Sequence, residues 1–368
     1  MLHCVQHDIF DIGNKLPTIT TLISSMINIG VIGYGYWGPN LVRNFSEIPG
    51  ATVKTVSDFK PELLAKVQAR YPKINLTTDC RDIFTDPNID AVAIATPVST
   101  HFDLALAALQ AGKHVLVEKP MTVSSEQAMR LIDEAQKRNL VLMVDHTFVY
   151  TSAVRKMRDL VITKALGDIY YYDSVRVNLG LFQHDVNVIW DLAVHDLSIM
   201  NYVLPSQPYA VSATGMSHVP GEPENIAYLT LFFEGNLMAH INVNWLAPVK
   251  VRRTLIGGSQ KMIVFDDLEP SEKLKVYDKG ITLNGNKEES IYKMLIGYRT
   301  GDMWAPHLEM TEALRIEGLH FIDCIKTGTS PITDGEAGLQ IVRILEAATQ
   351  SMKKQGRLVE LDLMKVAA

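Results

Sequence analysis

The stretch Asn28-Ile29-Gly30-Val31-Ile32-Gly33-Tyr34-Gly35-Tyr36-Trp37-Gly38-Pro39-Asn40 decides the fold. A β-branched run enters a glycine turn, and a helix is predicted from Leu41 to Phe45. Gly33, Gly35 and Gly38 fit G-x-G-x-x-G, which gives a tight turn, room for a pyrophosphate, and close helix–strand packing. The helix then points its first N–H groups at the phosphates. The pattern predicts a dinucleotide site, and the alternative is a plain glycine turn in a parallel sheet.

Composition limits the class of protein. The 368 residues suggest about two domains. A net charge of −6 and the lack of a basic block argue against nucleic acid as a partner. Cys4, Cys80 and Cys324 lie far apart, with neither zinc spacing nor a disulfide framework. A reducing cytoplasm is the simplest interpretation.

Residues 1–25 show no periodicity. The apolar pair Leu22-Ile23 is too short to span a membrane, and no signal-peptide cleavage pattern follows it. We therefore expect a poorly ordered extension, upstream of an original start at Met26. The alternative is an ordered arm on the surface.

Strands and helices alternate over residues 26–146. After the first strand, five more are predicted at Thr52–Val56, Ile74–Leu76, Ile89–Ala95, His114–Glu118 and Leu140–Val144. Six strands separated by helices indicate a doubly wound parallel sheet, the Rossmann type of α/β domain. Ligands of such sheets bind beyond the carboxyl ends of the strands, where the glycine turn, Asp58, Thr96-Pro97 and Glu118-Lys119-Pro120 should converge.

The pattern changes over residues 147–368. Helices are predicted at about Thr151–Thr163, Asn187–Tyr202, Glu312–Lys326 and Asp334–Lys354. Between them lie seven strand-like runs with short connections, which favour antiparallel hairpins. The runs are Ile169–Val177, Ala210–Thr214, Ala227–Phe233, Leu237–Trp245, Arg252–Ile256, Met262–Asp266 and Leu274–Tyr277. We predict an α+β domain with a large, open, mostly antiparallel sheet, whose uncovered face is buried in a homodimer or homotetramer.

Asp58 stands about twenty residues beyond the glycine turn, at the end of the next strand. A carboxylate there accepts hydrogen bonds from the adenosine ribose diol and repels a 2′-phosphate, which favours NAD over NADP. Lys60 weakens this preference slightly. The alternative is an aspartate that only caps the next helix.

Lys119 ends a buried strand at the ligand-facing edge, where packing does not require a lysine. It could polarise a substrate oxygen beside the nicotinamide. The following Pro120 keeps Lys119 extended, and a cis bond between them is possible. The alternative is a solvated lysine at a strand end.

The segment Trp190-Asp191-Leu192-Ala193-Val194-His195-Asp196 is the candidate in the second domain. Asp191 and His195 are four residues apart, so they share one face of a helix. His195 can take an alcohol proton as hydride leaves, and Asp191 can orient it. The alternatives are a core histidine and a metal ligand, but two ligands are too few and we predict no metal.

Further cations have no clear assignment. Alternation places Lys250 and Arg252 on one strand face and Arg253 on the other. They could meet a substrate phosphate, although a solvated sheet face or a dimer rim is the more common arrangement. Arg155 on the first helix of this domain carries the same ambiguity.

These motifs together resemble the glucose-fructose oxidoreductase / inositol dehydrogenase / MocA family. They are the glycine turn, the Ala95-Thr96-Pro97 stop, Glu118-Lys119-Pro120 and Asp191-x-x-x-His195-Asp196, in that order from about Met26 to the end. The resemblance implies an NAD(P)-dependent enzyme in which Lys119 and His195 act on the reacting alcohol, with Asp191 beside them. It implies a cofactor site of the glycine turn with Tyr36 and Trp37, Asp58, Thr96, Pro97, His101, Glu118 and Lys119. The substrate would meet Arg155, Trp190, Asp191 and His195.

Within the family, Gly33 to Asn40, Val251-Arg252-Arg253 and Phe265-Asp266-Asp267 look most like the sugar-nucleotide 3-dehydrogenase branch. That resemblance implies NAD-dependent oxidation of the 3-hydroxyl of UDP-N-acetylglucosamine or its uronic acid, ahead of amination and polysaccharide assembly. An NADP-linked deoxysugar ketoreductase and a polyol dehydrogenase are alternatives of the same fold. A non-catalytic NAD-binding sensor is an alternative of another class. No nucleic-acid or membrane partner is predicted.

Overall fold

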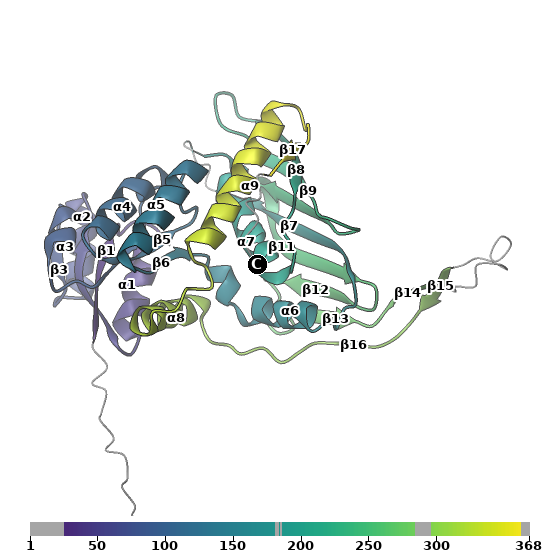
Figure 1. Cartoon of the computed structure of the whole chain (residues 1–368), viewed down its shortest axis with the longest axis horizontal. Coiled ribbons are helices and arrows are strands. Elements are labelled where there is room, and N and C mark those ends of the chain that lie inside the picture. The colour runs from purple at the N-terminus through teal and green to yellow at the C-terminus, as the bar shows by residue number, and fades with distance from the viewer. Residues whose placement is uncertain (1–25, 181–183, 185, 284–295, 362–368) are drawn as a thin grey trace, which may run out of the picture.

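We describe a computed structural model of the chain over residues 26–180, 184, 186–283 and 296–361. The extension expected over residues 1–25 lies outside the described residues. The described chain forms a parallel sheet, a larger mixed sheet and a two-stranded hairpin. Figure 1 shows the two large sheets side by side along the long axis of the molecule.

The first sheet contains six parallel strands in the order β3-β2-β1-β4-β5-β6. This is the strand order of the doubly wound dinucleotide-binding fold, as the sequence predicts. β4 is buried along its whole length, as a parallel strand covered on both faces should be. The strands are β1 (Ile27–Ile32), β2 (Ala51–Ser57), β3 (Asn75–Thr77), β4 (Ala91–Ile94), β5 (His114–Glu118) and β6 (Leu142–Asp145).

Helices connect these strands. Ser124 caps α5, because its Oγ accepts a hydrogen bond from the backbone N–H of Gln127 at 3.3 Å. A 3₁₀ turn, η1 (Val98–Thr100), follows Thr96-Pro97 and precedes α4. The helices are α1 (Gly38–Glu47), α2 (Pro61–Arg70), α3 (Arg81–Thr85), α4 (His101–Gln110) and α5 (Ser125–Arg138).

The second sheet contains nine strands in the order β16-β13-β12-β11-β7-β10-β9-β8-β17. Its strand pairs are antiparallel except β7 with β10. The strands are β7 (Ile169–Leu179), β8 (Ala210–Met216), β9 (Ile226–Phe232), β10 (Met238–Asn244), β11 (Leu246–Gly258), β12 (Met262–Asp266), β13 (Leu274–Tyr277), β16 (Met303–Trp304) and β17 (Val359–Glu360). The separate hairpin is β14 (Gly280–Leu283) with β15 (Ile296–Arg299).

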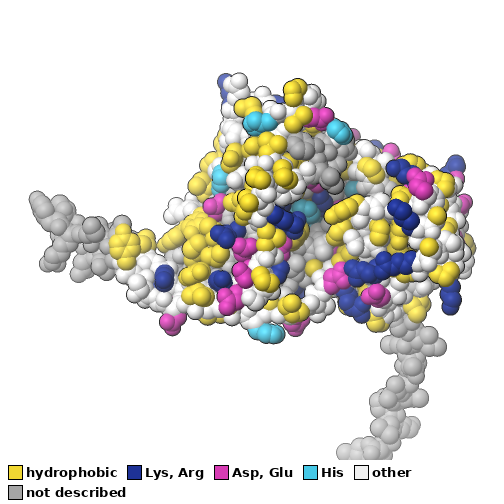
Figure 2. All heavy atoms as spheres, turned by 180° about the vertical axis from the view of Figure 1, so that it is seen from behind, with side chains coloured by type: hydrophobic (Ala, Val, Ile, Leu, Met, Phe, Trp, Pro, Cys, Tyr) yellow, Lys and Arg dark blue, Asp and Glu magenta, His cyan; other side chains and the backbone are white. Residues whose placement is uncertain are grey.

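The two faces of this sheet differ. Its inner face shares one hydrophobic core with α6 (Ser152–Ile162), α7 (Val194–Val203) and α9 (Gly335–Lys353). The face seen from behind carries many hydrophobic side chains (Figure 2). Exposed aromatic and methionine side chains of the sheet strands include Tyr171, Tyr228 and Met238. Such a surface is typical of a protein–protein contact.

The end of the chain returns to the first domain. Helix α8 (Ala313–Thr327) places Phe321 in the same core as Phe45 of α1, with ring centroids 6.2 Å apart. Helix α9 packs against α5 as well as against β8. The division into residues 26–146 and 147–368 stays a prediction, and α8 is one of the parts of the second segment that contribute to the cores of the first. None of the described helices is long and apolar enough to cross a membrane.

Candidate active site

The three glycines of the turn have different surroundings. Gly33 has φ +95°, and a Cβ there would lie 2.5 Å from the carbonyl oxygen of Ala95. A Cβ on Gly38 would lie 2.1 Å from the carbonyl oxygen of Gly33, whereas one on Gly35 would meet no atom within 4 Å. The chain's own packing therefore requires the first and third glycines, and the second borders open space that a pyrophosphate fits. No side chain caps the start of α1. Asn40 N donates to the carbonyl oxygen of Trp37 at 2.9 Å and Pro39 has no N–H, so the N–H of Gly38 is the first-turn donor that a phosphate oxygen could use.

Asp58 holds the turn from the side. Its Oδ2 accepts a hydrogen bond from Tyr34 N at 2.7 Å, and its Oδ1 accepts one from Lys60 N at 2.9 Å. A carboxylate has further lone pairs, so Asp58 can still accept from a ribose diol. Tyr36 is 89% exposed at the rim of the turn. Asp58 therefore lies against the glycine turn and Tyr36 at its exposed rim, and their roles in a cofactor site stay predictions.

His101 is 1% exposed. Its Nδ1 lies 2.8 Å from the carbonyl oxygen of Pro120, and its Nε2 lies 2.8 Å from that of Thr96. The resemblance implies that His101 lines the cofactor. The structure instead places it behind the two loops that end β4 and β5, where it holds Thr96, Pro97 and the segment after Lys119 in position.

Lys119 joins the two halves of the molecule. The Lys119–Pro120 bond is cis. Lys119 Nζ lies 3.0 Å from the carbonyl oxygen and 3.4 Å from Oδ1 of Asp191, at the start of the helix that contains His195. Trp245 Nε1 donates to Asp191 Oδ2 at 3.1 Å. The Asp191 carboxylate therefore orients the ammonium of Lys119, and the expectation that it orients His195 is corrected.

His195 lies one turn beyond Asp191. The first turn of the predicted helix is a π-helix, η3 (Ile189–Ala193), which continues as α7. The His195 ring packs edge-on against Phe148 with centroids 5.0 Å apart, and its Nδ1 is buried without a partner. Burial, followed by the charges of Lys119 and Arg176, lowers the pKa of His195 well below its usual value. The imidazole is therefore neutral at neutral pH and able to accept a proton.

Two residues that were predicted to contact the substrate have their partners outside the cluster of Lys119, Asp191 and His195. Trp190 Nε1 donates to Thr349 Oγ1 of α9 at 3.0 Å. Arg155 on α6 is one of the charges near His320 of α8, where it helps burial to lower the pKa of that imidazole. The structure therefore brings Lys119, Asp191 and His195 together, whereas Trp190 and Arg155 point toward α9 and α8.

Three carboxyl groups meet below the site. Glu118 and Asp145 are register partners at the ends of β5 and β6, and Glu317 approaches from α8. Burial, and secondly the charge of Asp145, raises the pKa of Glu118 and of Glu317 well above the usual range. Trp37 Nε1 donates to Asp145 Oδ2 at 2.7 Å, so this cluster also supports the glycine turn. In the described residues no group of His, Cys, Asp and Glu is placed to hold a metal ion.

The raised pKa of Glu317 predicts a stability change with pH. A carboxyl whose folded pKa exceeds its unfolded pKa stabilises fully below the unfolded value and loses that contribution as pH rises through the folded value. Glu317→Gln should therefore gain stability over the native protein as pH increases, by about 1.4 kcal/mol per unit of pKa difference. Melting temperatures of both proteins from pH 4 to pH 9 measure this, with exposed Glu62→Gln as the control. Parallel curves for Glu317→Gln and the native protein would contradict it.

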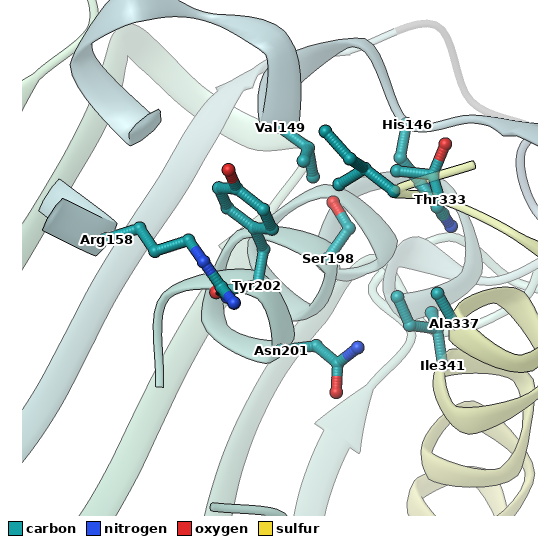
Figure 3. A pocket seen from close by; sticks show the side chains of 10 residues that line it. His146, Val149, Arg158, Ser198, Asn201, Tyr202, Thr333, Ala337 and Ile341 are labelled. Atoms are coloured by element: carbon teal, nitrogen blue, oxygen red, sulfur yellow. Dashed lines mark hydrogen bonds between the residues drawn. The ribbon is translucent and has the colours of Figure 1, made fainter. Parts of the chain in front are cut away.

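A cavity of about 360 Å³ lies between α6, α7 and α9. Figure 3 shows His146 and Thr333 at one end and Arg158 beside Tyr202 at the other. It contains none of the predicted catalytic side chains. Burial, followed by the charge of Lys119, lowers the pKa of His146, one of the lining residues, to about 3. Lys119 therefore lies close enough to this cavity for its charge to act on His146.

Several residues of the site escaped the sequence analysis. Asp145 ends a parallel strand and His146 follows it directly, so the rule that selected Glu118 and Lys119 would have selected them too. Phe148 and Trp245 contact His195 and Asp191 through tertiary packing, for which the sequence carries no local signal.

The strand order, the uncapped helix and the open glycine turn define an NAD-binding domain of an oxidoreductase. Residues 27–146 match the family described as "Oxidoreductase family, NAD-binding Rossmann fold", and residues 154–264 match "GFO/IDH/MocA C-terminal domain". The chain belongs to this GFO/IDH/MocA family, which confirms the predicted family, fold class and NAD cofactor.

Named relatives are dehydrogenases. The UDP-N-acetylglucosamine 3-dehydrogenase of Acidithiobacillus ferrooxidans is 28% identical over 334 residues, covering 87% of this chain and 95% of that protein. A solved structure of that enzyme has a TM-score of 0.72 at 26% identity, covering 89% of this chain and 97% of its own. The myo-inositol 2-dehydrogenase of Thermotoga maritima is 24% identical, covering 91% of this chain and 99% of that protein. Levoglucosan dehydrogenase in complex with NADH is 22% identical, with a TM-score of 0.77 over 92% of this chain and 100% of its own, and shares the fold. The protein is thus a dehydrogenase of a sugar and polyol oxidoreductase family.

Proposed function

We propose that the protein oxidises the 3-hydroxyl of a sugar nucleotide such as UDP-N-acetylglucosamine or its uronic acid, with NAD in preference to NADP. The observation that carries this proposal is the contact of Lys119 with Asp191, one turn before His195, at the carboxyl edge of the first sheet. The choice of substrate is supported by the 28% identical 3-dehydrogenase. The ketone product suits a following amination, ahead of polysaccharide assembly.

The chemistry divides between two side chains. Oxidation of a secondary alcohol removes a hydride from carbon and a proton from oxygen. Bound NAD supplies the hydride acceptor. Lys119, fixed by Asp191, donates a hydrogen bond to the hydroxyl oxygen and holds it in place. The neutral imidazole of His195 accepts the hydroxyl proton.

We also infer how the chain divides its tasks. Residues 26–146 bind the cofactor, and residues 147–368 bind the substrate and form the oligomer through the face that carries Tyr171, Tyr228 and Met238. The cysteine pattern supports a cytoplasmic location.

A panel of sugar nucleotides and inositols, followed by NADH absorbance, tests the substrate. Turnover of the sugar nucleotides alone supports the proposal. Turnover of inositols alone favours the second candidate, a polyol dehydrogenase, which the 24% identical inositol enzyme suggests. Binding of NAD without turnover of any substrate favours a sensor.

The cofactor preference gives a separate test. Asp58→Asn removes the charge that repels a 2′-phosphate and retains an oxygen that can accept one backbone N–H. We expect the ratio of kcat/KM for NAD over NADP to fall about tenfold, equivalent to about 1.4 kcal/mol. The exposed Asp133→Asn on α5 is the control. An unchanged ratio would remove Asp58 from the ribose site.

A further inference from the structure

Two guanidinium groups lie together on the inner face of the second sheet. Arg252 of β11 is the direct register partner of Arg176 of β7. The Cζ atom of Arg252 lies 5.6 Å from the centre of the Phe148 ring, and the Cζ atom of Arg176 lies 4.5 Å from it. The same ring contacts His195 with centroids 5.0 Å apart. Both cations are therefore one aromatic ring away from the imidazole that we place at the reacting hydroxyl.

Arg252 has unused hydrogen-bonding capacity. Its Nη1 donates to Asp267 Oδ2 at 3.3 Å, while its Nε is buried without a partner. Within the described ranges its Nη2 donates no hydrogen bond, and its side chain is 28% exposed. Arg176 Nε and Nη2 donate to Asp196 at 2.6 and 3.3 Å, but its Nη1 is also buried without a partner. A ligand can reach the exposed part of the Arg252 side chain, and its negative charge would compensate the two buried donors that have no acceptor of their own.

The local charges do not balance. Asp196 pairs with Arg176, but Asp267 is shared between Arg252 at 3.3 Å and Lys273 at 3.4 Å. Two cations therefore face one carboxylate. Like charges directly opposite each other on neighbouring strands repel, so an additional anion would stabilise this arrangement.

The next residue along the strand shows the contrast. Arg253 lies on the other face of β11, and both its Nε and its Nη2 donate to Asp266. It has its own carboxylate partner, and its side chain is 54% exposed. Arg253 is therefore a matched control for Arg252 in residue type and position.

We propose that Arg252, with Arg176 beside it, binds an anionic group of the substrate, so that the enzyme selects charged sugars over neutral polyols. This inference rests on the proposed function and narrows it. The anion is a uronate carboxylate or the phosphate nearest the sugar, because both lie a few bonds from the 3-carbon. A neutral inositol carries neither group and leaves Arg252 without its acceptor.

The test compares four full-length proteins: native, Arg252→Met, Arg252→Lys and Arg253→Met. Each is assayed with NAD on UDP-N-acetylglucosaminuronate, UDP-N-acetylglucosamine and myo-inositol. We expect Arg252→Met to raise KM about 10- to 100-fold for charged substrates, Arg252→Lys to raise it less, and Arg253→Met to leave it unchanged. A loss confined to the uronate identifies the carboxylate, and an equal loss on both nucleotides identifies the phosphate. Unchanged KM values, or an equal loss that includes inositol, would overturn the inference.

A binding measurement separates this inference from the proposed function. The probes are D-glucuronate for the carboxylate and D-glucose 1-phosphate for the phosphate. At least one of them should raise the melting temperature of the native protein and Arg253→Met, by about 2 °C near saturation, but not that of Arg252→Met. D-glucose should shift none of them. If the native enzyme oxidises only inositols, the proposed function fails. The shifts in melting temperature with the anionic probes still show whether Arg252 binds an anion. No shift with either glucuronate or glucose 1-phosphate, or shifts with glucose equal to those with the two anions, would reject the site.

Discussion

Lys119→Ala should lower kcat on the best sugar nucleotide by about 10²- to 10⁴-fold, the usual contribution of acid–base assistance. The same loss is expected for His195→Ala. Both side chains serve one proton transfer, so the double variant should lose less than the product of the two single losses. Steady-state turnover of the three variants and the native enzyme, followed by NADH absorbance, gives the comparison.

The cofactor site should survive these changes, because Gly35, Asp58 and the start of α1 remain intact. NAD affinity, measured by titration of tryptophan fluorescence, is therefore expected to stay within a few-fold of native. Lys137→Ala on the exposed side of α5 is the control for removal of a positive charge. Full turnover in both Lys119→Ala and His195→Ala would reject the proposed roles.

The second large effect separates two glycines of the turn. Gly35→Ala adds a methyl group that meets no protein atom within 4 Å, so the melting temperature should stay close to native. The methyl enters the space left for the pyrophosphate, so NAD affinity should fall about tenfold or more. Gly38→Ala places its methyl 2.1 Å from the carbonyl oxygen of Gly33, which forces the helix away from the strand. This variant should lose about 1–3 kcal/mol of stability through overpacking.

Calorimetry and NAD titration on the same two variants provide the test. Each variant is the control of the other, because both add one methyl group within the same turn. A loss of stability in Gly35→Ala with unchanged NAD affinity would show that the turn serves packing alone.

Much of the fold could be predicted because its signals are local. The parallel sheet follows from buried runs such as 89–95 separated by helices, and β12 and β13 have the predicted limits. Turn glycines and the order of the motifs led to the family. These features depend on neighbours in the sequence, and the residue pattern therefore reports them.

The details that were missed depend on distant contacts. The pattern of apolar residues before His195 predicts an ordinary α-helix. It carries no signal for the π turn that the structure has there. Asp191 accepts hydrogen bonds from Lys119 and Trp245 because tertiary folding brings three remote segments together. Arg252 was noticed among the cations of its strand, but only the structure shows Phe148 and Arg176 beside it.

The return of α8 has a consequence for synthesis of the protein. Phe321 and Cys324 fill the core around Phe45, although they are made long after the last strand of the first sheet. Until α8 has been synthesised, the N-terminal domain therefore exposes the apolar groove that α8 later covers. A message truncated before α8 would yield a chain that exposes this groove, which makes it a target for chaperones and proteases rather than a working half-enzyme.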